Sequence, residues 1–192
     1  YGKVPLPPYI TAHLEDNERY QTVFANEESS VAAPTAGLHL TQSVLDEIKQ
    51  VGADIAFIEL SVGLGTFRPI EANDITHHSM HEEKYRIAST VWTACQEAER
   101  VVAIGTTVVR ALETAAVTKV LEGKSDLFIT PGFEFKVVDA LLTNFHQPRS
   151  TLLVMIEAFM GDGWRELYSA ALAEGYRFLS FGDAMFLDRQ VV

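Results

Sequence analysis

Polar side chains that could do acid–base chemistry gather in residues 143–151 (TNFHQPRST), which lead into an apolar, helix-forming segment. Imidazole titrates near physiological pH, so we predict that His146 carries protons in a reaction. Asn144, Arg149 and Ser150 flank this histidine and are predicted to bind the substrate. The alternative for His146 is a structural loop histidine that is hydrogen-bonded to the backbone.

A glycine-containing turn at residues 61–67 (SVGLGTF) follows a predicted strand. Glycines let the backbone come close to a ligand and present its N–H groups. We therefore predict that Gly63, Gly65, Thr66 and Phe67 line a cofactor pocket. The dinucleotide-binding fingerprint is absent, because a third glycine and a following helix are missing. The alternative is a tight turn that binds nothing.

A second loop of this kind, Gly105-Thr106-Thr107, lies between a predicted strand and a predicted helix. Helix N-termini bind anions through free N–H groups and the helix dipole. Arg110 in the first turn opposes that dipole, so it costs local stability and is a better candidate for ligand contact. Glu113, three residues on, can pair with Arg110 on the same helix face. We predict that these five residues contact the cofactor; the alternative is an ordinary surface ion pair.

Two further segments contain histidines. His77, His78 and His81 have a spacing that suits a metal site, but the segment lacks the H-E-x-x-H pattern and no cysteine pair supports it. We expect no metal and predict a substrate-binding role for His81. Residues 31–39 (VAAPTAGLH) combine small residues with a glycine before a predicted helix, which suits tight backbone packing near a site. His39, at their end, is as consistent with a structural role as with a functional one.

The elements that would position these loops alternate between strands and helices of about ten residues. The expected helices are 41–51, 90–98, 107–116, 151–160 and 165–173, and the expected strands are 54–60, 101–104, 127–129 and 184–187. This alternation predicts an α/β fold with a mixed, mostly parallel sheet flanked by helices. Ligands of such folds bind beyond the carboxyl ends of the strands, where the loops described above would lie.

The composition limits the class of protein. The length of 192 residues fits one large domain or two small ones. The hydrophobic fraction of 47% is ordinary for a globular core. Its net charge of −11 argues against a general nucleic-acid binder and confines any RNA contact to a local patch or to residues outside this chain. Cys95, the single cysteine, cannot form an internal disulfide, so we expect a reducing compartment, the cytoplasm. No apolar run is long enough to span a bilayer, and the chain starts without Met, which indicates a fragment or a processed chain.

Taken together, the motifs follow the order found in one family, and the chain resembles it over nearly its whole length. This family is the S-adenosylmethionine:tRNA ribosyltransferase-isomerases of queuosine biosynthesis. The segments that carry the resemblance are 4–10 (VPLPPYI), 19–23 (RYQTV), 31–39 (VAAPTAGLH), 62–67 (VGLGTF), 80–82 (MHE), 104–110 (IGTTVVR) with Leu112 and Glu113, 130–133 (TPGF) with Lys136 and Asp139, 142–146 (LTNFH) with Pro148 and 150–152 (STL), 176–178 (YRF) and 181–185 (FGDAM). Two departures are Ser61, where histidine is expected, and Leu40, where phenylalanine is expected.

The resemblance implies a reaction in which S-adenosylmethionine donates its ribosyl group. That group would move onto the aminomethyl-deazaguanine base at the wobble position of tRNA and rearrange to give epoxyqueuosine, with release of adenine and methionine. The implied fold is an α/β domain interrupted by an inserted β-barrel. Residues 1–192 would be the C-terminal part of the α/β domain, and the barrel would be absent from this chain. The implied co-substrate is S-adenosylmethionine without a metal, and the implied partner is tRNA with a deazaguanine-type base.

The implied reaction needs a base that removes a proton near the sulfonium and an acid for the leaving adenine. We predict that His39, His146 and Asp183 share these tasks, without assigning a role to each. Arg110 would bind the methionine carboxylate, or a tRNA phosphate, beside the amides of residues 105–107. Two other functions stay open: a truncated or degenerate paralogue that only binds RNA or protein, and a methyltransferase that uses the same cofactor. The missing glycine fingerprint and the motif order disfavour the methyltransferase.

Overall fold

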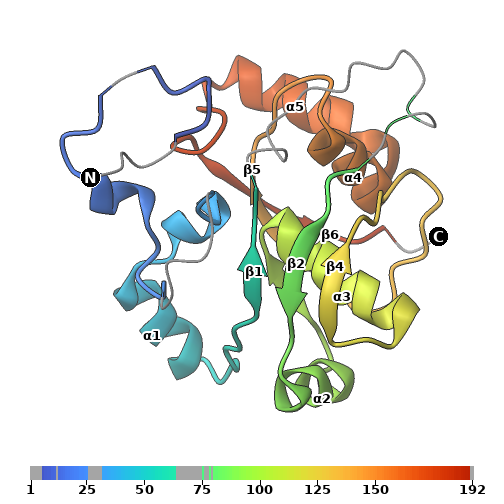
Figure 1. Cartoon of the computed structure of the whole chain (residues 1–192). Helices are drawn as coiled ribbons and strands as arrows, with labels where there is room; N and C mark the ends of the chain where they lie inside the picture. Colours follow the sequence, from blue (N-terminus) through green and yellow to red (C-terminus); the bar gives the residue numbers. More distant parts are fainter. Residues whose placement is uncertain are drawn as a thin grey trace.

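Short strands form two small sheets in the computed structural model, and helices pack around them (Figure 1). The structure describes residues 6–11, 13–25, 32–63, 75, 78 and 80–190. In this part of the chain, no helix is long and apolar enough to cross a membrane. The mixture of strands and helices confirms the predicted α/β class.

The first sheet has the strand order β1-β2-β4, and both strand pairs are antiparallel. Its strands are β1 (Glu59–Ser61), β2 (Glu83–Arg86) and β4 (Glu122–Ser125). Burial alternates along β2, so Glu83 and Tyr85 are buried while Lys84 and Arg86 face solvent. One face of this sheet therefore packs against the core and the other is open.

The second sheet has the strand order β3-β5-β6. Its strands are β3 (Val102–Ile104), β5 (Ala140–Asn144) and β6 (Ala184–Asp188). β3 and β5 run parallel, with Ile104 opposite Leu142, whereas β5 and β6 run antiparallel. The expectation of a mostly parallel sheet is not confirmed, because the other strand pairs among the described residues are antiparallel. Alternation of strands and helices does not fix sheet membership: α2 (Ser89–Glu97) joins β2 of the first sheet to β3 of the second.

The best-predicted helices begin at side-chain caps. α1 (Gln42–Gln50) follows Thr41, whose Oγ1 accepts a backbone N–H at 3.3 Å, and Gly52 with φ 86° lies beyond its end. α4 (Thr151–Met160) follows Ser150, whose Oγ accepts a backbone N–H at 3.2 Å. The other helices among the described residues are α3 (Thr106–Thr118), α5 (Trp164–Ala173) and the 3-10 helices η1 (Asn17–Tyr20), η2 (Thr35–His39) and η5 (Gly161–Gly163).

Several strand predictions differ from the structure. The predicted strand 54–60 is mostly irregular, because strand pairing begins only at Glu59. The predicted strand 127–129 is wrong, since the pairing lies just before it, in β4. β2 and β5 escaped prediction, because β2 (EKYR) is mostly charged and the end of β5 has the polar residues of a loop. The predicted helix 90–98 is α2, which begins one residue earlier, at Ser89.

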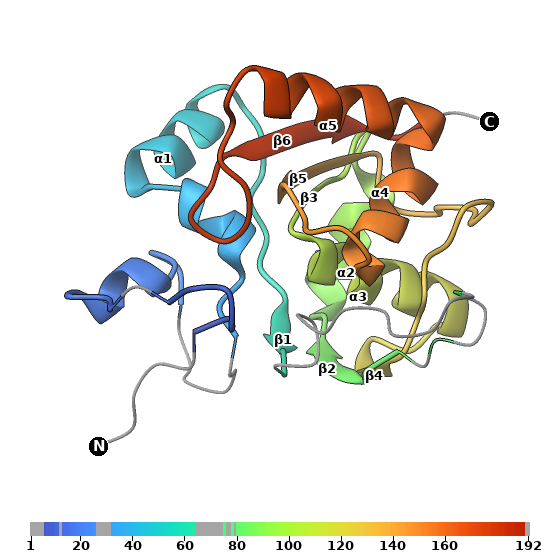
Figure 2. The same ribbon diagram turned by 90° about the horizontal axis from the view of Figure 1, so that it is seen from above.

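The main core lies between the second sheet and α3, α4 and α5 (Figure 2). An aromatic cluster anchors the chain that leaves β5. The ring of Phe145 lies 4.9 Å from that of Phe178, 5.5 Å from Tyr168 of α5 and 5.7 Å from Tyr176, measured between centroids. This packing fixes the carboxyl end of β5 relative to α5.

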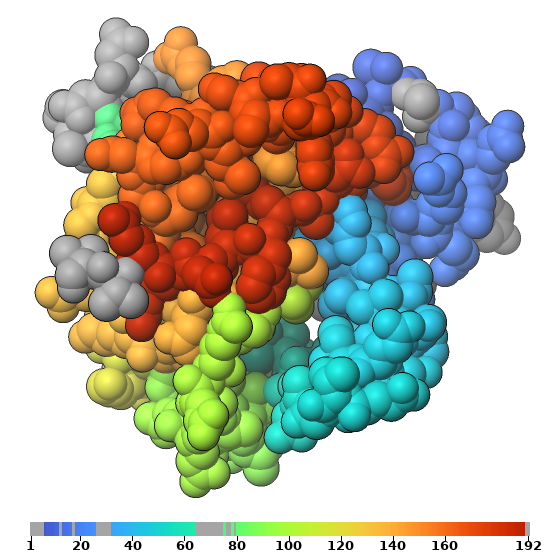
Figure 3. Space-filling view, turned by 180° about the vertical axis from the view of Figure 1, so that it is seen from behind, coloured from blue at the N-terminus to red at the C-terminus, as the bar shows by residue number. Residues whose placement is uncertain are grey.

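One face of the second sheet is open to solvent at its edge strands, β3 and β6. Val102 and Phe186 are 42% and 54% exposed, and the Arg100 guanidinium lies 5.6 Å from the ring centroid of Phe186. Figure 3 shows the red segment that includes β6 at the surface, between α5 and the green of α2. The side chains of Leu141 and Leu187 are buried in the core. Burial therefore alternates along the edge strand β6, whereas the central strand β5 is mostly buried on both faces.

Candidate active site

The candidate site forms where the carboxyl ends of β3 and β5 meet η2. The Gly105 N–H, directly after β3, donates to the Leu142 carbonyl of β5 at 2.8 Å. Gly105 has a φ of 95°, a backbone conformation that favours glycine. A Cβ at this position would lie 3.7 Å from the Cβ of Ala36, so η2 sits directly against the end of β3. Open α/β sheets bind ligands beyond the carboxyl ends of their parallel strands, which is the place of this junction.

Asn144, the last residue of β5, joins the sheet to η2. Its buried amide accepts a hydrogen bond at Oδ1 from the Thr35 hydroxyl at 3.0 Å. Its Nδ2 lies 3.1 Å from Nε2 of His39, whose side chain is partly exposed. The structure therefore brings together two residues predicted from the sequence, Asn144 and His39, and adds Thr35.

Asp183 lies just before β6, and Arg177 holds its carboxylate. The carboxylate accepts the backbone N–H of Arg177 at 2.7 Å and its side-chain Nη2 at 2.9 Å. The hydrogen bond from the Arg177 side chain is the largest cause that lowers the pKa of Asp183. Asp183 is therefore negatively charged at neutral pH and lies within electrostatic reach of His39.

The loop that carries Asp183 has a tight backbone. A Cβ on Gly182 would overlap the carbonyl oxygen of Arg177 and the backbone of Phe178, so a larger residue does not fit. The Asp183 N–H donates to the Arg177 carbonyl at 2.7 Å, and the Gly182 N–H donates to the Leu179 carbonyl at 3.0 Å. These bonds close the loop on itself and fix the direction of the carboxylate.

The N-terminal arm, by which we mean the described part of residues 6–25, supports this loop from outside (dark blue and red in Figure 1). The hydroxyls of Tyr9 and Ser180 are hydrogen-bonded at 2.8 Å. The ring of Tyr20 packs edge-on against that of Phe181, with centroids 5.8 Å apart. The arm therefore belongs to the framework of the site, although it contributes none of the residues predicted to act there.

His146 lies in the core. Burial lowers its pKa to about 3, so the ring is neutral throughout the physiological range. Its Nε2 is hydrogen-bonded to the Thr143 hydroxyl at 3.2 Å, and its backbone N–H donates to the Tyr168 hydroxyl at 3.0 Å. The predicted role of His146 assumed that its ring titrates near neutral pH, and a pKa of about 3 is inconsistent with that assumption. The structure favours the alternative of a structural histidine, with a side chain as the partner of its ring.

Arg110 is also buried, and its donors face acceptors of the protein. Nη1 pairs with Oε2 of Glu83 in β2 at 2.7 Å, and the two side chains are 4% and 3% exposed. Nε donates to the Leu127 carbonyl at 3.1 Å, and Nη2 donates to the carbonyls of Ser125 at 3.1 Å and His81 at 3.2 Å. Arg110 therefore ties α3 to β2, to β4 and to the segments beside them.

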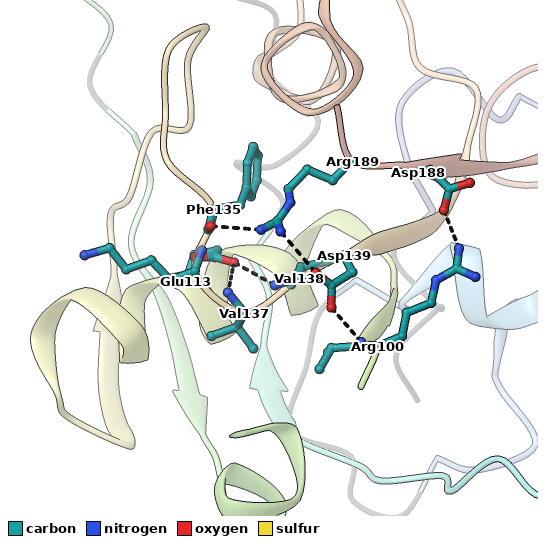
Figure 4. Close-up of polar contacts among 10 residues, drawn as sticks. Arg100, Glu113, Phe135, Val137, Val138, Asp139, Asp188 and Arg189 are labelled. Atoms are coloured by element: carbon teal, nitrogen blue, oxygen red, sulfur yellow. Dashed lines mark hydrogen bonds and ion pairs between the residues drawn. The ribbon is translucent and has the colours of Figure 1, made fainter. Parts of the chain in front are cut away.

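Glu113 does not pair with Arg110, so that prediction is wrong. Its carboxylate is fully buried and accepts backbone N–H groups from Lys136 at 2.8 Å, Val137 at 3.0 Å and Val138 at 2.9 Å (Figure 4). Three charge-assisted hydrogen bonds account for a buried carboxylate without a cation. Glu113 thus holds the chain that enters β5.

Asp139 completes the support of β5. Its carboxylate accepts the Val101 N–H at 2.9 Å and pairs with Nη2 of Arg189 at 3.2 Å. Nη1 of Arg189 donates to the Phe135 carbonyl at 2.9 Å, which links the end of β6 to the same segment (Figure 4). The two carboxylates, Glu113 and Asp139, fix the start of β5, and the strand positions Asn144 at its other end.

The remaining predicted site residues lie outside the cluster or outside the described residues. Thr106 is buried and Thr107 is partly exposed in the first turn of α3, where N–H groups have no partner within the helix. Ser150 caps α4, whereas Arg149 (φ 57°), His81 and Gly63 are exposed. Gly65, Thr66, Phe67 and His77 lie outside the described residues. Among the described residues, no three His, Cys, Asp or Glu side chains are grouped to hold a metal ion.

Two residues of the cluster, Thr35 and Arg177, were missed by the sequence analysis. Thr35 and His39 are the first and last residues of η2, and both side chains reach Asn144. Arg177 lies six residues before Asp183 with a glycine between them, a spacing that suits a closed loop. Thr35 lies in the motif 31–39 and Arg177 in the motif 176–178, but the sequence analysis selected only His39 and Asp183 as site residues.

Comparison with known proteins identifies relatives over nearly the whole chain. A family described as queuosine biosynthesis protein matches residues 1–187. A protein of Natranaerobius thermophilus is 54% identical over 195 residues, which cover 97% of this chain and 57% of that protein. A protein of Moorella thermoacetica is 52% identical with the same coverage of each chain. Both are named S-adenosylmethionine:tRNA ribosyltransferase-isomerase.

A solved structure gives the same result. The crystal structure of an S-adenosylmethionine tRNA ribosyltransferase from Thermotoga maritima superposes with a TM-score of 0.65 at 42% sequence identity. The match covers 79% of this chain and 50% of that one. The chain thus spans little more than half the length of the curated relatives it matches. By family match, identity and fold, the chain belongs to the family of queuosine biosynthesis proteins whose relatives are named S-adenosylmethionine:tRNA ribosyltransferase-isomerase.

Proposed function

We propose that the protein to which this chain belongs transfers the ribosyl group of S-adenosylmethionine to tRNA and isomerises it. The acceptor is an aminomethyl-deazaguanine base at the wobble position, and the products are epoxyqueuosine in tRNA, adenine and methionine. The observation that carries this proposal is an identity of 54% over 97% of the chain to a relative named for that activity. The proposal includes a cytoplasmic location, where tRNA is modified, and the assignment of residues 1–192 to the α/β domain.

The cluster at the strand ends supports this chemistry by its composition. The reaction must break a C–H bond beside a positively charged sulfonium and release adenine as a leaving group. The Asp183 carboxylate is ionised and offers a negative charge for the sulfonium or an acceptor for the proton. His39 and Asn144 offer a half-buried imidazole and an amide beside it. His146 has no part in the proposal, because it is neutral and buried.

The binding residues are proposed from residue type and motif. The N–H groups of Thr106 and Thr107 at the start of α3 are proposed to bind the methionine carboxylate. The sequence analysis had given this role to Arg110. Gly63, with Gly65, Thr66 and Phe67 of the same motif, is proposed for the adenosine. The tRNA contacts are proposed for the exposed side chains of His81 and Arg149, because a net charge of −11 confines any RNA contact of this chain to a local patch.

Release of adenine from S-adenosylmethionine in the presence of substrate tRNA tests the proposal. The natural protein that contains this chain is expected to release adenine and methionine in equal amounts. Asp183→Asn should lower the rate by about 10²–10⁴-fold, the usual contribution of an acid–base group. Asp54→Asn, at an exposed carboxylate, is the matched control and should keep the wild-type rate.

Two results would overturn the proposal. Formation of S-adenosylhomocysteine in place of adenine and methionine would make the protein a methyltransferase. Binding of tRNA without any release of adenine would leave the alternative of a binding module. An unchanged rate for Asp183→Asn would remove this carboxylate from the site while leaving the activity in place.

A further inference from the structure

Thr35, Asn144 and His39 form a chain of two hydrogen bonds in which each group sets the role of the next. The Thr35 hydroxyl donates to Oδ1 of Asn144 at 3.0 Å, and this turns Nδ2 of the amide toward Nε2 of His39 at 3.1 Å. An amide NH₂ group donates and has no lone pair with which to accept. Nε2 of His39 is therefore the acceptor, and in the neutral ring the hydrogen is on Nδ1.

The structure holds this amide in place. Asn144 is only 4% exposed and is paired with Ala184 of β6 in the sheet, so its backbone is fixed. η2 is pressed against the N-terminal arm, since a Cβ on Gly37 would lie 2.7 Å from the Phe24 ring. Thr35 and His39 are therefore presented to Asn144 by a segment with little room to move.

The other nitrogen of the ring is the one that can meet a ligand. The His39 side chain is partly exposed, and among the described residues no hydrogen bond reaches Nδ1. A ring held in this way presents an N–H donor to the site. It cannot take up a proton at Nδ1, and its lone pair at Nε2 is occupied by Asn144.

We propose that Thr35 is a positioning residue that, through Asn144, holds His39 in the Nδ1–H tautomer, so that His39 offers the substrate a hydrogen-bond donor and is not the base of the reaction. This inference rests on the proposed function and deepens it. The expected acceptor is a ring nitrogen of the adenine or an oxygen of the ribosyl group. Orientation of a catalytic imidazole by a second group is a general device for fixing its tautomer.

The tautomer can be measured directly. In the natural protein labelled with ¹⁵N at histidine, the ring-nitrogen shifts at alkaline pH distinguish Nδ1–H from Nε2–H. Wild type and Thr35→Ser, which keeps the hydroxyl, are expected to show His39 with Nδ1–H. Thr35→Val removes the hydroxyl at the same volume, frees the amide to turn and should give a mixture of tautomers. Wild type with Nε2–H, or Thr35→Val with an unchanged tautomer, would overturn the proposal.

Kinetics give a second, separate readout. Thr35→Val should lower kcat for adenine release on the order of tenfold, the low end of the effect of orienting partners, with KM for tRNA unchanged. Thr35→Ser should restore the wild-type kcat. A rise in KM alone would overturn the positioning role. A protein that releases no adenine would refute the proposed function, whereas the NMR spectrum of His39 would still decide the tautomer.

Discussion

Replacement of Arg110 by methionine tests whether this residue is a structural link or a ligand contact. Its ion pair with Glu83 is almost fully buried, with 2.7 Å between Nη1 and Oε2, and the guanidinium also donates to three backbone carbonyls. Removal of one partner from a buried pair leaves the other charge uncompensated, which costs about 3–5 kcal/mol. Arg110→Met should lower the free energy of unfolding by that amount.

A matched control lies on β2, the strand that carries Glu83. Arg86 of β2 pairs with Glu59, but these side chains are 54% and 61% exposed. Exposed pairs contribute about 0–1 kcal/mol, so Arg86→Met should have little effect. Urea unfolding followed by circular dichroism measures both variants. Equal losses of stability for Arg110→Met and Arg86→Met would refute the reasoning.

A double variant separates the pair from other effects of the substitution. Arg110→Met combined with Glu83→Leu removes both charges, so the double variant should lose less stability than the sum of the two single variants. Residues in direct contact show coupling energies of about 0.5–3 kcal/mol in such cycles. If Arg110→Met kept its stability and lost affinity for S-adenosylmethionine, the arginine would contact the cofactor, as its sequence position suggested.

Three further predictions follow from single residues. Glu113→Gln places an amide NH₂ against backbone N–H groups that now donate to the carboxylate, so it should lower the free energy of unfolding in urea by about 1–3 kcal/mol. Glu134→Gln, at an exposed carboxylate, is the control and should leave the stability unchanged. An unchanged stability of Glu113→Gln would contradict the assignment of a buried, hydrogen-bonded carboxylate. The unfolded chain protonates His146 below pH 6.5 but the folded chain only near pH 3, so stability is fully present above pH 6.5 and falls by about 1.4 kcal/mol per unit as pH drops below it. His146→Gln should flatten this part of the pH–stability curve, and an identical curve would exclude a depressed pKa. Gly182→Ala should displace the Asp183 loop and abolish adenine release, while Gly123→Ala, with its nearest neighbour 3.9 Å away, should be active; normal activity of Gly182→Ala would show that the loop is not needed.

The sequence predicted those elements whose signals are local. The expected helices 41–51 and 151–160 match the starts of α1 and α4 to within a residue, where Thr41 and Ser150 cap them. β2 could not be predicted in this way, because its inward face carries the charge of Glu83. That charge is buried only because Arg110 reaches it from α3, 27 residues later in the chain. Long-range pairing of this kind leaves no periodic signal in a short segment.

The site residues were predicted in part for the same reason. Asn144, His39 and Asp183 were selected by residue type and motif, and strand order brings them together at one end of the second sheet. The burial of His146 depends on Tyr168, which arrives with α5 and is 22 residues away in the sequence. Arg110 was predicted in the first turn of its helix but is the fifth residue of α3, and the sequence does not show that this face of α3 points into the protein.

The fate of the two parts of S-adenosylmethionine tests the central claim most directly. The natural protein would be incubated with substrate tRNA and with cofactor labelled either on the ribosyl carbons or on the methyl group, and label in the purified tRNA would be counted. The proposed reaction predicts that ribosyl label enters tRNA and that methyl label leaves with methionine. Methyl label in tRNA without ribosyl label would contradict the assignment of this chain to a ribosyl-transferring enzyme.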